Sequence, residues 1–199
     1  AQKDQNFRNV LFGKNLKVCP ELYHYYPHRI FLEALPEGAE EQELVFTMLS
    51  PHMLIPLIRY NSKDTGGIIS YDSLKKTLNK FGQENLLPAL KLPLVWVGGR
   101  KDRYLEVEDK RIYPEEIKQN LYEDFHVASL TTGYFKLNKD KKILEIQLKE
   151  GFDPTEEIKT SFKNAVLKGI DIDLPLVLYP YHAFPYGMTL DYEHKFQNI

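Results

Sequence analysis

The pattern of apolar residues changes near the middle of this 199-residue chain, at the pair Gly98-Gly99. Before the pair, short apolar runs alternate with Pro, Gly and polar residues, which is typical of strands joined by turns. After it, segments with the apolar spacing of helices are mixed with strand-like segments. Because a domain usually takes about 100 to 200 residues, the chain has room for one domain or two small ones. We predict two, residues 1–98 and residues 99–199.

The first of these domains is predicted to be rich in β structure. Its strand-like runs, each ending at turn-forming residues, are residues 29–35, 43–49 and 56–60. Short strands at this spacing favour a small barrel or sandwich. A single helix is expected to begin after a cap at Asp72 or Ser73, to bury one face of residues 74–81, and to stop at Gly82.

The second domain is predicted to be a small α+β domain with helices on one face of a sheet. The expected elements are a helix from Pro114 to Phe125, strands at 126–135 and 143–149, a helix capped at Asp153, and a strand at 172–179.

Composition and charge exclude several classes of protein. With 26 Lys and Arg against 28 Asp and Glu, the net charge of -2 offers no basic surface for nucleic acid. The sequence contains no apolar run of 18 residues, so it predicts no membrane-spanning helix. The single cysteine, Cys19, cannot form an intrachain disulfide, so we expect a reducing, cytoplasmic setting. Cys19, His24 and His28 lie close in sequence, but without a second cysteine nearby they predict no metal site.

Three segments are candidate sites, and each also has a plain structural interpretation. Asp64, after a strand-like run and before Thr-Gly, is typical of a turn, although a carboxylate there can also bind the hydroxyls of a ribose. The segment from Gly99 to Asp102 is typical of a polar linker, or of a hinge whose Arg100 reaches a phosphate or ribose. Lys195 lies in an aromatic-rich tail, where a lysine is usually solvated.

Four motifs in one order resemble a known family. They are Leu44-Val45-Phe46-Thr47, residues 56–64 (PLIRYNSKD), Gly99-Arg100-Lys101-Asp102 and residues 112–117 (IYPEEI). This order resembles the adenylate-forming superfamily of AMP-forming acyl-CoA synthetases, most nearly the phenylacetate-CoA ligase-like branch. The resemblance covers roughly residues 17–199 and implies a β-rich, barrel-like subdomain of a large adenylation domain, followed by a mobile α+β C-terminal domain.

The resemblance implies a role for four residues. Asp64 matches the ribose-binding Asp, and Arg100 matches the Arg that contacts the nucleotide. Asp102 matches the hinge about which the C-terminal domain rotates between the two half-reactions. Lys195 matches by position the catalytic lysine that bridges carboxylate and α-phosphate. The implied substrates are ATP with Mg and a small carboxylic acid, with CoA, an amine or a protein as acyl acceptor.

The sequence also departs from the family pattern. The Ser/Thr/Gly-rich phosphate loop is absent, so we expect this chain to be the C-terminal part of a longer enzyme and to be inactive without its N-terminal part. Glu106 and Glu108-Asp109 replace the usual Lys and Arg-Gly pair, which leaves open whether CoA is the acceptor. His194, not Gly, precedes Lys195. The alternative is a non-catalytic binding or regulatory module descended from the same family.

Overall fold

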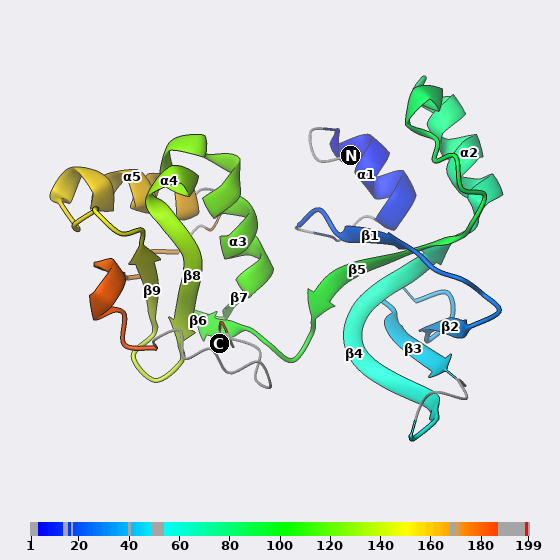
Figure 1. Cartoon of the computed structure of the whole chain (residues 1–199), viewed down its shortest axis with the longest axis horizontal. Helices are drawn as coiled ribbons and strands as arrows, with labels where there is room; N and C mark the ends of the chain where they lie inside the picture. The colour runs from blue at the N-terminus through cyan, green and yellow to red at the C-terminus, as the bar shows by residue number, and fades with distance from the viewer. Residues whose placement is uncertain are drawn as a thin grey trace. The chain divides into compact units, whose positions relative to one another are not determined.

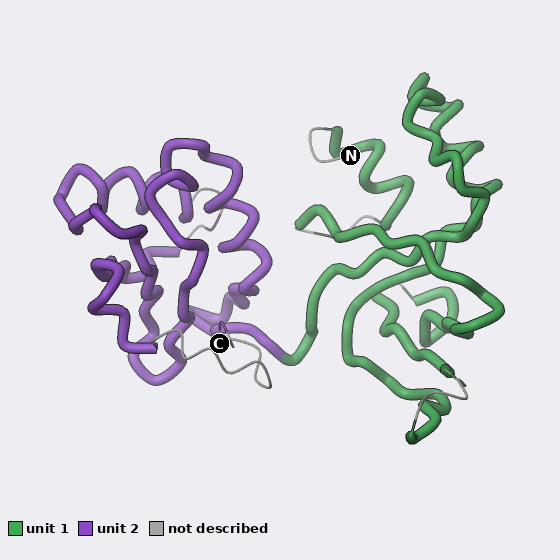
Figure 2. Tube along the Cα trace, in the orientation of Figure 1, with its two compact units in different colours: residues 1–102 green, residues 103–199 purple. Residues whose placement is uncertain are grey.

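The computed structural model describes residues 4–13, 16, 18–39, 41–48, 54–167, 170, 172–186 and 198. The chain divides into two compact units, Ala1–Asp102 and Arg103–Ile199, which are coloured separately in Figure 2. The pair Gly98-Gly99 lies inside a strand rather than in a linker. The chain leaves unit 1 only after Asp102, four residues beyond the predicted domain boundary at 98.

Unit 1 is a five-stranded antiparallel sheet with helices on one face (Figure 1). Its strands are β1 (Glu21–His24), β2 (Ile30–Leu35), β3 (Glu43–Met48), β4 (Leu57–Ile69) and β5 (Leu94–Arg100). Its helices are α1 (Gln5–Phe12), α2 (Tyr71–Lys80) and the short 3₁₀ helix η1 (Glu84–Leu86). The strand order is β1-β5-β4-β3-β2.

The core of unit 1 lies between the two α-helices and the sheet. Buried side chains from α1, α2, β4 and β5 form this core, and they are Phe7, Phe12, Ile69, Leu74, Leu78, Leu94 and Trp96. Ser70 caps α2 by accepting a hydrogen bond from the Ser73 amide, so the predicted cap at Asp72 or Ser73 is wrong by two or three residues. The helix ends at Lys80, and Gly82 follows in a left-handed conformation with φ of 64°.

The predicted barrel is wrong. Within the described residues the sheet of unit 1 is open, with β1 and β2 as its two edges. Helices, rather than a second sheet, cover the face that contains Trp96, so the strands need not close on themselves. The α+β class itself is confirmed.

The described part of unit 2 combines a mixed three-stranded sheet and a separate β-hairpin with three α-helices and a short 3₁₀ helix. Its strands are β6 (Leu105–Val107), β7 (Lys110–Ile112), β8 (Thr131–Asn138), β9 (Ile143–Leu148) and β10 (Leu176–Tyr179). Its helices are α3 (Pro114–Glu123), α4 (Phe125–Leu130), α5 (Glu156–Val166) and η2 (Tyr181–Ala183). β8, β9 and β10 form the sheet, in which β9 is antiparallel to β8 and parallel to β10. β6 and β7 form a separate hairpin whose turn residues, Glu108 and Asp109, both have positive φ.

Several details of unit 2 differ from the sequence prediction, among them the last strand, which begins at Leu176 rather than at residue 172. Phe125 does not continue α3 but begins the unpredicted helix α4, because Asp124 caps a new helix by accepting hydrogen bonds from the amides of His126 and Val127. Phe125 is 88% exposed there. Strand β8 consequently begins at Thr131 rather than at residue 126. Helix α5 is capped by the hydroxyl of Thr155 rather than by Asp153.

A buried acid lies on the β9 face opposite the apolar core. Leu144, Ile146 and Leu148 alternate into the core, so Glu145 lies on the other face, where it is only 1% exposed. Its carboxylate accepts hydrogen bonds from Tyr179 Oη at 2.9 Å, Tyr186 Oη at 2.5 Å and Asn138 Nδ2 at 3.1 Å. These bonds connect three other segments of unit 2 to β9. Burial raises the pKa of Glu145, but the three hydrogen bonds outweigh it and leave the pKa below its usual value.

The low pKa of Glu145 predicts a pH-dependent stability of unit 2. A carboxyl group whose pKa is lower in the folded state stabilises the fold above its unfolded pKa of about 4.3, and this stabilisation is lost as the pH falls through the folded value. We expect Glu145→Gln to lower the free energy of unfolding by about 1–3 kcal/mol at pH 7. The loss should shrink below about pH 4.

Urea unfolding of both proteins between pH 3 and 7, followed by circular dichroism, measures this difference. Glu106→Gln, at an exposed glutamate in the same unit, is the control and should follow the wild type. Parallel pH profiles for the Glu145 and Glu106 variants would contradict the role given to the buried carboxylate.

Candidate functional site

Asp64 lies within a long, irregular strand and not in the turn that one interpretation of the sequence predicts. Strand β4 does not end at Tyr60 but continues through the polar segment to Ile69. Two side chains of that segment replace regular ladder contacts: the Lys63 amide donates to Asn61 Oδ1 at 2.8 Å, and the Asp64 amide donates to Ser62 Oγ at 3.3 Å. Lys63 has a φ of 64°. The segment is therefore a distorted stretch of strand, stabilised by its own polar side chains.

Two glycines allow β4 to lie close to both neighbouring strands. A Cβ atom at Gly66 would come within 2.5 Å of the Leu44 side chain on β3 and of the Trp96 carbonyl oxygen on β5. A Cβ atom at Gly67 would come within 2.5 Å of Trp96 Nε1. The register of β4 against β5, which places Asp64, therefore depends on the absence of side chains at these two positions.

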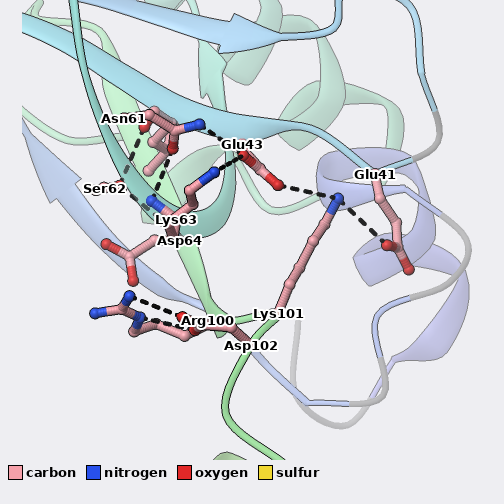
Figure 3. Close-up of polar contacts among 10 residues, drawn as sticks. Glu41, Glu43, Asn61, Ser62, Lys63, Asp64, Arg100, Lys101 and Asp102 are labelled. Atoms are coloured by element: carbon pink, nitrogen blue, oxygen red, sulfur yellow. Dashed lines mark hydrogen bonds and ion pairs between the residues drawn. The ribbon is translucent and has the colours of Figure 1, made fainter.

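The register brings two of the predicted site residues together. Asp64 lies opposite Arg100, and Thr65 lies opposite Gly99, in the antiparallel pairing of β4 with β5. Side chains directly opposite each other lie on the same face of a sheet. Figure 3 shows the Asp64 carboxylate and the Arg100 guanidinium on the same side of this pairing, close to the end of β5.

Asp102 also contacts Arg100. Its two carboxylate oxygens accept from Arg100 Nε at 3.0 Å and Nη2 at 3.1 Å, a two-point contact. Hydrogen bonding to Asp102 raises the pKa of Arg100, and the charge of Asp64 adds to this effect. The Arg100 side chain is 34% exposed and that of Asp102 is 56% exposed, so water and ligands can reach both groups.

A second group of charges lies on the other side of the same strands. Lys63, next to Asp64, places its Nζ 3.8 Å from Glu43 Oε2. Lys101, next to Arg100, places its Nζ 3.5 Å from Glu41 and 3.9 Å from Glu43. Sequence reasoning missed these residues. A usable signal was that a lysine lies directly beside each of the two candidate residues, Lys63 beside Asp64 and Lys101 beside Arg100, since neighbours along a strand point to opposite faces.

The arrangement can bind a polar ligand with hydroxyl and anionic groups. Asp64 offers a carboxylate that accepts hydrogen bonds, and Arg100 offers a planar set of donors. Asp102 is the last residue of unit 1, at the boundary to unit 2. Lys195, the fourth predicted site residue, lies outside the described residues.

The described residues include neither a metal-ligand cluster nor a membrane-spanning helix. Within the described ranges, no group of three or more His, Cys, Asp or Glu side chains is placed to hold a metal ion. None of the helices in the described part of the chain has the length and apolar character needed to span a membrane.

Comparison with known proteins gives a likeness of fold. No family model and no curated protein matches the sequence. Among solved structures, 2-hydroxyisobutyryl-CoA ligase in the postadenylation state, in complex with R3-HIB-AMP, matches with a TM-score of 0.52 at 18% identity. The match covers 77% of this chain and 33% of the ligase. The fold of this chain is therefore similar to that of part of this ligase, and the chain spans about a third of the ligase's length.

The same ligase also matches in another state. Its open conformation, in complex with 2-HIB-AMP and CoA, has a TM-score of 0.40 and 17% identity, over 86% of this chain and 36% of the ligase.

The glycine contacts predict a stability difference between two matched variants. Gly66→Ala should destabilise unit 1 by about 1–3 kcal/mol, because backbone and side-chain atoms on both sides must shift. Gly98→Ala is the control, since its Cβ would come no closer than 3.2 Å to another atom, at the flexible end of Leu16, with the Trp96 ring next at 3.4 Å. Urea unfolding followed by Trp96 fluorescence compares them, and an equal loss in both variants would contradict the close approach at Gly66.

Proposed function

We propose that this chain is the C-terminal part of an AMP-forming ligase of the phenylacetate-CoA ligase-like branch, and that Asp64 and Arg100 bind the nucleotide. The observation that carries the proposal is the pairing of these two residues on one face of β4 and β5. The likeness of fold to part of an acyl-CoA ligase supports it. So does the order of the four motifs along the sequence.

The proposed reaction has two steps. In the first, a carboxylate oxygen of the acid attacks the α-phosphorus of ATP, which reacts as its Mg complex, and the bond to the β-phosphate breaks. The products are an acyl-adenylate and pyrophosphate. In the second, the acceptor attacks the acyl carbon, and AMP leaves.

Asp64 and Arg100 have complementary tasks in this proposal. The two oxygens of Asp64 accept hydrogen bonds from the two ribose hydroxyls, as a charged acceptor does well. Arg100 donates to the nucleotide from the same face and is held beforehand by its two-point contact with Asp102. This contact limits the conformations of Arg100 before the nucleotide binds, which reduces the entropy cost of binding.

Two further residues complete the proposal. Asp102, at the boundary between the units, is the proposed hinge, because large domain movements concentrate in a few residues at the ends of elements. Lys195 is the proposed catalytic residue, whose cation stabilises the negative charge that develops as the acid attacks the α-phosphate.

The acceptor is proposed to be CoA or an amine or protein. Glu108 and Asp109 form the turn of the β6–β7 hairpin with φ of 49° and 62°, the left-handed region that glycine adopts most readily. The turn therefore keeps a glycine-like backbone while it presents two carboxylates.

We propose a cytoplasmic setting, which suits the use of ATP and the single cysteine.

The ribose contact is tested by Asp64→Asn in the longer polypeptide that contains this chain. Carboxylate-dependent exchange between ATP and pyrophosphate should show a KM for ATP raised about tenfold to a hundredfold, the loss expected when a charged acceptor becomes neutral. Asp72→Asn, at an exposed aspartate of α2, is the control and should leave the KM unchanged. Absence of exchange in the wild-type longer polypeptide would favour the binding or regulatory module instead.

The lysine is tested by separating the two half-reactions. In the same longer polypeptide, Lys195→Ala should slow adenylate formation at least about a hundredfold, the scale of losing one group that stabilises developing charge. Transfer from preformed acyl-adenylate should change much less, because the α-phosphate bond has already formed. Single-turnover rates measure the two steps, and an equal loss in both would remove Lys195 from the adenylation site.

A further inference from the structure

Glu43 contacts the residues next to both proposed nucleotide-binding side chains. It is the first residue of β3, and its side chain is 27% exposed. Its carboxylate accepts a hydrogen bond from Asn61 Nδ2 at 2.7 Å and lies 3.8 Å from Lys63 Nζ and 3.9 Å from Lys101 Nζ (Figure 3). One acid therefore connects β3 with the two strands that contain Asp64 and Arg100.

The face of the sheet on which Glu43 lies determines the face on which the two lysines lie. Lys63 precedes Asp64 on β4, and Lys101 directly follows Arg100, the last residue of β5. Glu43 lies opposite Thr65 in the pairing of β3 with β4, so its side chain shares the face of Thr65 and not that of Asp64. An acid on that face that contacts both lysines keeps them away from the Asp64 and Arg100 face. Figure 3 shows this separation, with Glu43 near the two lysine ammonium groups and Arg100 near Asp64.

Glu43 also acts on the backbone just before Asp64. It holds the side-chain amide of Asn61, whose Oδ1 accepts from the Lys63 amide at 2.8 Å. Lys63 has a φ of 64°, an unfavourable conformation for a residue with a Cβ atom, and this hydrogen bond helps to maintain it. The direction in which the Asp64 side chain points away from β4 depends on this backbone conformation of Lys63.

We propose that Glu43 is a positioning residue that keeps the Asp64 carboxylate available to ribose hydroxyls, by holding Lys63 and Lys101 on the opposite face of the strands. This inference rests on the proposed function. It assigns Glu43 no contact with substrate, and it concerns selectivity for the ribose rather than the chemical step.

The charges explain what is lost without Glu43. Lys63 is the immediate neighbour of Asp64, and a flexible ammonium group released from Glu43 can pair with that carboxylate. A carboxylate that pairs with an ammonium group has fewer lone pairs for hydroxyl donors. The hydrogen bond from Asn61 lowers the pKa of Glu43, and the two lysines add to this, so Glu43 stays charged near neutral pH.

The test compares ATP with 2′,3′-dideoxy-ATP, which lacks both ribose hydroxyls, in pyrophosphate exchange by the longer polypeptide. The ratio of the two kcat/KM values measures recognition of the hydroxyls. Glu43→Gln keeps an oxygen for Asn61 but removes the charge, and we expect it to lower the ratio at least tenfold, mainly through the KM for ATP. Glu43→Ala, which removes both interactions, should lower it further.

Matched variants separate the possible outcomes. Glu41→Gln, which alters only the more exposed partner of Lys101, should keep the wild-type ratio. An equal fall in kcat/KM for both nucleotides in the Glu43 variants, with the ratio unchanged, would show a structural role and overturn the inference. If Asp64→Asn also keeps the wild-type ratio, the proposed function itself fails. If Asp64→Asn lowers the ratio of the two kcat/KM values while Glu43→Gln keeps the wild-type ratio, only the role of Glu43 fails.

Discussion

The register between β4 and β5 is the constraint on which the candidate site depends. Asp64 and Arg100 are 36 residues apart in sequence and meet only because these strands pair with Asp64 opposite Arg100. Gly66 and Gly67 permit the close approach of the strands, since a side chain at either position would collide with Leu44 or Trp96. A shift of the register by one residue would turn the Asp64 side chain to the face of Lys63 and Lys101 and would separate it from Arg100.

The charges around this register are sorted by face. On one face Asp64 lies near Arg100, whose guanidinium is held by Asp102. On the other, Glu43 and Glu41 neutralise the neighbouring lysines. These surface ion pairs contribute little stability each, because water screens them, so their main effect in this account is on the direction of side chains rather than on the free energy of folding.

Some of this could be predicted from the sequence, and the rest depended on pairing between distant segments. Helix α3 begins at Pro114 as expected, because a proline in the first turn followed by two glutamates is a local signal. The length of β4 was missed, since Asn61 and Ser62 look like turn residues until their side chains are seen to bond to the backbone of the same strand. The barrel was also wrong, because strand spacing does not reveal that α1 and α2 cover one face of the sheet. Glu43 was missed for a similar reason, as no local pattern connects it with Lys63 and Lys101.

The most direct test of the proposed function is a crystal structure of the proposed longer polypeptide with a non-hydrolysable acyl-adenylate analogue bound. Both oxygens of Asp64 should then lie within about 3.2 Å of the two ribose hydroxyls, with Arg100 in contact with the same nucleotide. Glu43 should remain beside Lys63 and Lys101 in that complex. A ribose bound elsewhere, with the Asp64 carboxylate paired to a lysine, would contradict it.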